Sequence, residues 1–486
     1  SVAVDDDEDL EPAVPLKQIL SVDQINLLRW GTNDEKHQVL AAVPADRAYD
    51  FVYALRPSQR KKLLPLAPVE LQRKLLLSVS PVQVVLSDLS AAKMLRAVYS
   101  HRQLNELMTD FWFNHFNVFF GKGADRYTLP TYEREAIRPH ALGRFYDLLL
   151  ATAKSPAMLY YLDNWESVAP DFDQRARRIP RKNQRKRGLN ENYGRELLEL
   201  HTLGVNGGYS QEDVIAAARC FTGWTIAAPR KGGGFEYNDR VHDKGEKTIL
   251  GHTIRAGGGM NDGLEVLQLL ARQPATAHHI SLELAQRFVA DDPPPSLVNR
   301  MADTFLKTDG DIGEVMKTMA QSPEFWSKGA YQAKVKSPFE MVVSAVRAVN
   351  ADVDSPAALV QQIVQLGEPL YRKIEPTGYS SANAEWVSSA ALLGRMNFAL
   401  ALTNDHIHGV RVDQNQWNSI SQDTLPDVAK MLLVGDPSSQ TMNAIQKAMN
   451  DPGTREQLIQ SAKLNQPQLP GLIAGLVIGS PEFQRR

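Results

Sequence analysis

Apolar residues recur at helical spacing along almost the whole chain, and no long segment alternates between apolar and polar residues as a half-buried strand would. From Leu16 to about Arg96, prolines separate the amphipathic segments, because proline has no backbone N–H to donate within a helix. The sequence therefore predicts an all-α fold, a large multi-helix array. One small β-hairpin is predicted near residues 235–254, directly after three glycines.

The length of 486 residues fits two or three domains or one large helical array. Residues 2–12 are strongly acidic, and we predict a flexible tail over residues 1–15. A helical domain is predicted over 16–327, with a C-terminal helical part, 328–486, packed on it as one continuous fold. The first residue is Ser1 and not methionine, from which we expect that an export leader has been removed.

Composition excludes several classes of protein. The net charge of −2 gives no general attraction to nucleic acid or membranes. No apolar run approaches the roughly 20 residues that span a bilayer, and the single cysteine, Cys220, excludes an internal disulfide framework. Neither a phosphate-binding glycine loop nor a GxSxG nucleophile motif is present. We therefore expect no membrane span and no nucleic-acid partner.

The most informative segment is Gly188–Trp224, GLNENYGRELLELHTLGVNGGYSQEDVIAAARCFTGW. It predicts a helix, a tight turn and a second helix. Gly204 is expected to end the first helix, and Gly207 and Gly208 to supply positive-φ turn positions. Ser210 followed by Asp213 predicts a capping box at the start of the second helix.

Within the first helix, Glu196 falls inside the edge of an apolar arc. A carboxyl group among apolar neighbours has a raised pKa and can serve as a general acid. The alternative is that Glu196 pairs with a buried arginine. Asn192 and Glu199 lie beside it on the helix surface, and Arg195 is four residues from Glu199, which is the spacing of an ion pair.

Other polar residues are weaker candidates. His115 points inward from the apolar helix 102–120, where a hydrogen-bonded core histidine is the commoner reading. Asp163 and Asn164 follow a buried run, as cleft-lining residues or as ordinary caps do. Residues 175–187 hold eight Arg or Lys, which indicates an anionic partner or a solvated loop.

Two later segments also offer candidates. His242 and Asp243 lie at the predicted hairpin turn, where one His–Asp pair is a weak metal signal. A proline- and glycine-rich link follows the helix in PFEMVVSAVRAV and has the composition of a cleft wall. It carries Tyr379 and Trp386 as candidate packing faces for a ligand, although aromatic residues more often belong to the core.

The segment NENYGRELLELHTLGVNGGYSQEDV with CFTGWT closely resembles the signature of the domain of unknown function 1800 family, a bacterial group. DFWFNHFNV, SPAMLYYLDN, HDKGEKTILG and LGEPLYRKIEPTGY also look like blocks of that family, so the resemblance covers roughly residues 20–486. It implies an exported protein, periplasmic or extracellular. It also implies a neighbouring protein that resembles alkaline phosphatases and sulfatases, and it does not establish an activity.

The preferred hypothesis is an exported hydrolase that acts on a glycan or acidic polysaccharide by carboxylate general acid/base catalysis and needs no cofactor. The alternatives are a metal-dependent enzyme with His and Glu ligands, drawn from His115, His201, His242, Glu196 and Glu199, or a non-enzymatic partner of the phosphatase-like protein. The candidate catalytic residues are Glu196, Glu199 and Asp163, no metal site is assigned in the preferred hypothesis, and the candidate substrate-binding residues are Asn192, Arg195, His115, Asn164, Trp224, His242, Asp243, Tyr379 and Trp386.

Overall fold

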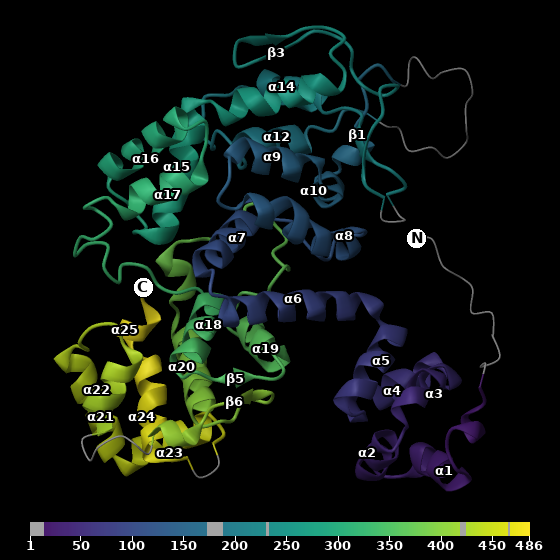
Figure 1. Ribbon diagram of the computed structural model, residues 1–486, viewed down its shortest axis with the longest axis vertical. Coiled ribbons are helices and arrows are strands. Elements are labelled where there is room, and N and C mark those ends of the chain that lie inside the picture. The colour runs from purple at the N-terminus through teal and green to yellow at the C-terminus, as the bar shows by residue number, and fades with distance from the viewer. Residues whose placement is uncertain (1–13, 173–187, 230–232, 418–423, 465–466) are drawn as a thin grey trace. The chain divides into compact units, whose positions relative to one another are not determined.

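The computed structural model describes residues 14–172, 188–229, 233–417, 424–464 and 467–486 (Figure 1). Contacts divide the chain into two compact units. The boundary between them in the sequence falls between Leu89 and Ser90, inside helix α6 (Pro81–Tyr99). The predicted division at 327/328 falls within the second unit, and most of the predicted acidic tail lies outside the described residues. The predicted all-α class is confirmed, since helices dominate and the strands are short.

The first unit is a set of short helices around a small apolar core. Two consecutive helices begin with capping boxes, Ser21 with Gln24 and Thr32 with Glu35, which satisfy backbone N–H groups at each helix start. The core includes Phe51, whose side chain is fully buried. The elements are η1 (Leu16–Gln18), α1 (Val22–Trp30), α2 (Asn33–Ala41), η2 (Ala45–Arg47), α3 (Ala48–Ala54), α4 (Pro57–Leu63), η3 (Leu64–Leu66) and α5 (Val69–Val79).

The first half of the second unit is built on α7, whose aromatic residues are almost all buried. Helix α14 packs on α9, and α15, α16 and α17 pack in succession (Figure 1). The helical elements are α7 (Gln103–His115), α8 (Asp125–Thr131), the π-helix η4 (Tyr132–Ile137), η5 (Arg138–His140), α9 (Phe145–Lys154), α10 (Pro156–Tyr161), η6 (Asn164–Glu166), α12 (Asn192–Glu199), α13 (Gln211–Cys220), α14 (Met260–Ala271), α15 (Pro274–Phe288), α16 (Pro295–Lys307) and α17 (Ile312–Ala320).

The second half packs around α24, an apolar helix that contacts α20 and α21. Among the residues that the structure describes, no helix is both long and apolar enough to cross a bilayer. The helical elements are α18 (Pro338–Ala348), α19 (Ala357–Gln365), η7 (Asn383–Trp386), α20 (Ser389–Thr403), η8 (Gln414–Trp417), α21 (Thr424–Leu432), α22 (Ser439–Asn450), α23 (Pro452–Ser461), α24 (Leu469–Ile478) and α25 (Pro481–Gln484).

The strands form short antiparallel pairs, and the predicted hairpin segment contributes to two of them. Strand β2 (Phe235–Tyr237) pairs with β1 (Trp224–Ile226), whereas β3 (Lys247–Ile249) and β4 (His252–Ile254) make their own hairpin. A third pair joins β5 (Asp352–Val353) to β6 (Val410–Arg411). The prediction of a single hairpin therefore missed that one strand of this segment, β2, pairs with the preceding strand β1.

The connection between α12 and α13 follows its local chemistry. Gly204 and Gly208 have φ of 83° and 80°, values that a residue with a Cβ rarely adopts, and Ser210 with Asp213 forms the predicted capping box. Two details of the prediction are wrong: α12 ends at Glu199 and not at Gly204, and Gly207 does not have a positive φ. Gly194 faces α13 so closely that an added Cβ would lie 2.9 Å from backbone atoms of Val214 and Ala218. A glycine at position 194 therefore lets the two helices meet backbone to backbone.

A short two-stranded clasp closes the C-terminal half. The backbones of Lys334 and Arg486 exchange two hydrogen bonds, of 3.1 and 2.8 Å, and the Lys336 N–H donates to the Gln484 carbonyl at 2.9 Å. Residues 334–336 and 484–486 are thus held side by side, although about 150 residues separate them in the sequence.

Candidate functional site

The α12 carboxylates lie on a partly exposed face of their helix. Tyr193 and Leu197 bury the opposite face against α13, which leaves Glu196 half-buried. Burial raises the pKa of Glu196, the neighbouring Glu199 raises it further, and Arg195 acts in the opposite direction. Among the described residues no cation lies within 4.0 Å of the Glu196 carboxylate, so the alternative of a buried Glu–Arg pair is not observed there.

Glu199 and Arg195 each have a different partner from the one expected. The Tyr209 hydroxyl donates to Glu199 Oε2 at 3.0 Å, and burial together with this carboxylate raises the pKa of Tyr209 to about 12. Arg195 lies 3.5 Å from Glu191 and donates to Gln211 Oε1 at 2.9 Å. Arg195 therefore pairs with Glu191, one helical turn before it, and not with Glu199 as its spacing suggested.

The turn after α10 lies against the start of α12. Asp163 has a left-handed backbone, with φ of 58°, and its carboxylate pairs with Lys122 at 2.8 Å. Asn190 donates to the Asp163 carbonyl at 3.0 Å, and Asn192 donates to the Leu162 carbonyl at 3.4 Å. Two of the candidate residues, Asp163 and Asn192, thus belong to one neighbourhood.

Tyr161 connects this turn to Glu196. Burial raises the pKa of Tyr161, and the next largest contribution comes from the Glu196 carboxylate. The Tyr161 hydroxyl donates to the Ile374 carbonyl at 2.6 Å, and Lys122 donates to the Tyr161 carbonyl. The Glu196 carboxylate is therefore close enough to Tyr161, two residues before Asp163, to influence its pKa.

Asn164 and Trp224 are core residues of the same region. Asn164 is fully buried and its amide donates to the Phe221 and Trp224 carbonyls, each at 3.1 Å. Trp224 is also fully buried, with its ring 5.0 Å from that of Phe221. Both residues are sealed from solvent, and they hold β1 against η6 and the end of α13.

His115 lies in a buried histidine cluster. Its Nδ1 is 2.6 Å from Glu283 Oε2, and its Nε2 is 3.3 Å from the His201 carbonyl. Burial works against ionisation of Glu283, but the two neighbouring histidines, His115 and His279, lower its pKa on balance. The His201 ring lies 6.2 Å from that of His115, and burial holds the His201 pKa well below its usual value. The core interpretation of His115 fits this environment.

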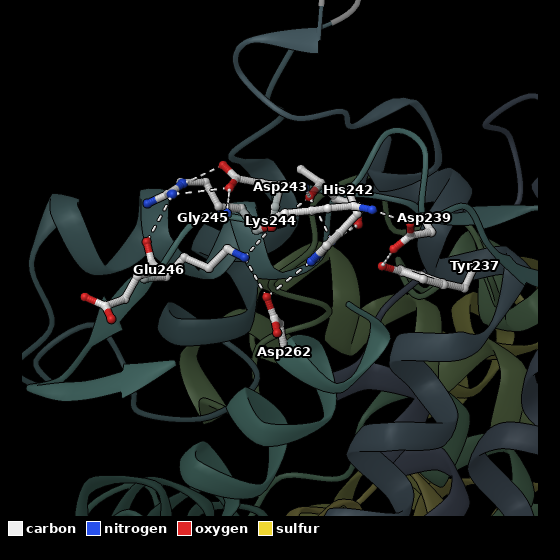
Figure 2. A network of polar contacts seen from close by, with 11 residues as sticks. Tyr237, Asp239, His242, Asp243, Lys244, Gly245, Glu246 and Asp262 are labelled. Atoms are coloured by element: carbon white, nitrogen blue, oxygen red, sulfur yellow. Dashed lines mark hydrogen bonds and ion pairs between the residues drawn. The ribbon is translucent and has the colours of Figure 1, made fainter. Parts of the chain in front are cut away.

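His242 and Asp243 belong to a second buried network, drawn in Figure 2. His242 Nδ1 lies 2.8 Å from the Thr222 carbonyl, and Nε2 lies 3.2 Å from Asp262 Oδ2. Lys247 Nζ is 2.5 Å from the same Asp262 oxygen and also donates to the Asp243 carbonyl. These side chains fasten the 235–254 segment to α13 and α14.

Asp243 completes that network from the surface side. Its carboxylate receives the Arg219 Nε–H at 2.7 Å. Burial opposes its ionisation, yet the Arg219 hydrogen bond lowers the Asp243 pKa on balance. The side chains of His242, Lys247 and Asp262 are at most 1% exposed, so this part of the network cannot touch a substrate in this conformation.

Tyr379 and Trp386 border two hollows. One has a volume of about 40 Å³, room for a few waters, and is also lined by Asp110 and Asn114. The other is an open hollow of about 420 Å³ that is lined by the 367–386 link itself. Asn114 fixes the link, since its Oδ1 accepts the Tyr379 N–H at 2.6 Å. The link therefore does form the wall of a hollow.

Sequence reasoning missed an extensive buried charge network. Lys93 lies 2.7 Å from Asp110, and Arg287 bridges Asp110 and Glu340 at 3.2 and 3.0 Å. Glu368 lies nearby, and burial followed by the charge of Asp110 raises its pKa to about 7. The available signal was the presence of single charges inside apolar helices, as in SAAKMLRAVY, LMTDFWF and PFEMVV.

The candidate residues therefore divide among several places. Glu196, Glu199, Arg195 and Asn192 share α12, and Asp163 adjoins them. Across the described residues, no hydrogen bond or ion pair joins this group to His115, to the His242–Asp243 network or to the Tyr379–Trp386 wall, and no three His, Cys, Asp or Glu side chains are placed to hold a metal ion. The basic run 175–187 lies outside the described residues.

The comparisons with known proteins assign the chain to a family of unknown function. The model for the family described as "Protein of unknown function (DUF1800)" matches residues 18–485. No curated protein and no solved structure matches the chain. Because the match covers nearly the whole sequence, the chain belongs to the DUF1800 family.

Proposed function

We propose that this protein is a hydrolase that cleaves glycosidic bonds by carboxylate general acid/base catalysis, with Glu196 as the acid. The observation that carries the proposal is the environment of Glu196: a half-buried carboxylate with a raised pKa and no cation within 4.0 Å among the described residues. A carboxyl group that keeps its proton can donate it to the leaving oxygen of a glycoside.

The second carboxylate of the proposal is Glu199. Residues three apart on a helix have Cβ atoms about 5–6 Å from each other, so their carboxyl groups reach the separation of about 5–10 Å that glycoside cleavage uses. The Tyr209 hydroxyl donates to Glu199 at 3.0 Å, a contact that holds this carboxylate in place. The pair thus combines a carboxyl group of raised pKa with a second carboxylate on the same helix.

Asp163 is the alternative second carboxylate, because its turn lies against the start of α12 and its side chain is partly exposed. Its pair with Lys122 at 2.8 Å makes it the weaker choice, since that cation already compensates its charge. An acidic polysaccharide is the proposed substrate class, because eight Arg or Lys residues at 175–187 directly precede the α12 segment in sequence. We also propose that the protein acts outside the cytoplasm, which fractionation of the native cells would test.

The test compares the wild-type protein with Glu196→Gln and Glu199→Gln on a panel of neutral and acidic polysaccharides. The release of reducing ends measures the activity of each protein. Loss of a general acid lowers kcat by about 10²–10⁴-fold, and Gln keeps the shape of the side chain, so the unfolding midpoint should stay close to that of the wild type. Glu212→Gln, an exposed carboxylate on α13, is the matched control and should retain activity.

The pH profile adds a second measurement. Because the acid form of Glu196 is the active one in this proposal, activity falls as pH rises through its raised pKa. A fully active, folded Glu196→Gln variant would refute the assignment. Release of no product from any polysaccharide of the panel would count against the glycan substrate.

A further inference from the structure

A large cavity lies away from the α12 carboxylates, since no residue of that helix lines it. It has a volume of about 790 Å³, within the range of about 300–1,000 Å³ that is typical of small-molecule sites. Its walls include residues of α7, α18, α25, the segment after α17 and the part of α6 after Ser90, and all of its lining residues belong to the second unit. One face of α18 runs along it, since Phe339, Val343 and Arg347 recur every four residues on its wall.

The carboxylates on the wall are already satisfied. Asp110 pairs with Lys93 at 2.7 Å, and Glu106 receives two hydrogen bonds of 2.9 Å from Arg138. Glu340 lies 3.0 Å from both Arg287 and Arg486. Glu133 and Glu482 likewise have hydrogen-bonding partners at 3.0 Å or closer. The wall therefore has no carboxylate in need of a cationic ligand.

The basic side chains are not all satisfied. Within the described parts of the chain, neither Lys336 nor Arg347 has a carboxylate within 4.0 Å, although both line the cavity. Arg347 is exposed and donates to the Val98 carbonyl. Lys336 is partly buried, and its Nζ lies over the Phe483 ring, 4.1 Å from the centroid. The wall thus offers positive charge without a matching anion.

The rest of the wall is largely apolar, including at the mouth. Phe288, Phe325 and Val343 line the interior. Trp326 and Val434 also line the cavity and are 76% and 85% exposed, so its apolar surface continues to the solvent. An apolar body inside the cavity would cover part of this surface.

We propose that this cavity binds a small amphipathic carboxylate, whose charged group pairs with Lys336 and whose apolar body packs along α18 between Phe288 and Phe325. Burial lowers the pKa of Lys336 to about 8, and an anion at its Nζ would reverse that shift by stabilising the charged form. The proposal concerns binding and does not depend on the α12 carboxylates.

Decanoate is a suitable probe, with decyltrimethylammonium as the cation of equal chain length. Isothermal titration of the full chain should show one saturable decanoate site. The cation should bind about tenfold or more weakly, because it gains no charge-assisted hydrogen bond from Lys336. Fluorescence should change with decanoate in the wild type and change less in Trp326→Phe, since that side chain lies at the mouth.

Four variants test where decanoate binds. Lys336→Met should weaken decanoate binding by about tenfold or more, whereas Lys336→Arg should restore most of it. Ser344→Trp adds bulk to the α18 face and should block binding, and Lys328→Met, an exposed lysine that does not line the cavity, should bind as the wild type does.

The proposal is overturned if decanoate shows no saturable binding, if the cation binds as tightly as decanoate, or if folded Lys336→Met and Ser344→Trp proteins both bind like the wild type. Circular dichroism and the urea midpoint establish folding of each variant. Should Lys336→Met fail to fold, Lys336→Arg and Ser344→Trp decide the outcome between them.

Discussion

The buried contact between Lys247 and Asp262 gives the sharpest test of how this fold is held together. Asp262→Asn keeps the size of the side chain and removes its charge, which leaves the Lys247 ammonium in a place where its side chain is 0% exposed. Breaking a buried pair by removing one partner typically costs about 3–5 kcal/mol, because the remaining charge has lost both water and counter-ion. The Asp243 carbonyl still accepts from Lys247, so we expect a loss near the lower end, about 3 kcal/mol.

Urea unfolding of four proteins measures this effect: the wild type, Asp262→Asn, Lys247→Met and the double variant. The double variant should be more stable than Asp262→Asn, because no unpaired buried charge remains in it. Glu265→Gln is the control on the same helix: its pair with His252 at 2.7 Å is about half exposed, and such pairs contribute only about 0–1 kcal/mol. The reasoning is refuted if Asp262→Asn costs no more than the control, or if the two single losses simply add.

Two further predictions concern stability. Gly194→Ala should destabilise the protein by about 1–3 kcal/mol despite the better helix propensity of alanine, because its Cβ would lie 2.9 Å from backbone atoms of α13; an unchanged or higher urea midpoint would contradict this. Burial raises the pKa of Asp125 from its usual 3.8 to about 8, so the folded state binds more protons than the unfolded state between these values. The contribution of Asp125 to stability is therefore present at low pH and is lost as pH rises from about 4 to 8. In Asp125→Asn the urea midpoint should change less with pH across that window. An equally steep pH dependence in this variant would show that another group is responsible.

The parts of the fold that sequence reasoning predicted are those fixed by neighbouring residues. Gly208 and the Ser210–Asp213 capping box form the turn before α13 as expected, because φ preference and capping act within a few residues. The end of α12 was predicted less well, since the helix ends at Glu199 and not at Gly204. Helical spacing was sufficient for the all-α class, since it depends only on which residues face inward.

The interactions that sequence reasoning missed join distant residues. His115 contacts Glu283 across 168 positions, and nothing local to either residue indicates the other. His242 was a weak metal candidate because Asp243 follows it, whereas its side-chain partners, Thr222 and Asp262, each lie 20 residues away in sequence. Whether Glu196 and Glu199 are catalytic stays a prediction, because the fold places them on a partly exposed face without showing what they bind.

The clasp between residues 334–336 and 484–486 couples the proposed carboxylate site to long-range order in the chain. Phe483 and Arg486 reach the wall only when their segment has docked beside Lys334, about 150 residues earlier in sequence. A molecule held there would therefore favour the docked arrangement by RT ln(1 + [L]/Kd). Occupancy of this cavity would then lower the frequency with which the last residues of the described chain detach, and their susceptibility to protease would report it.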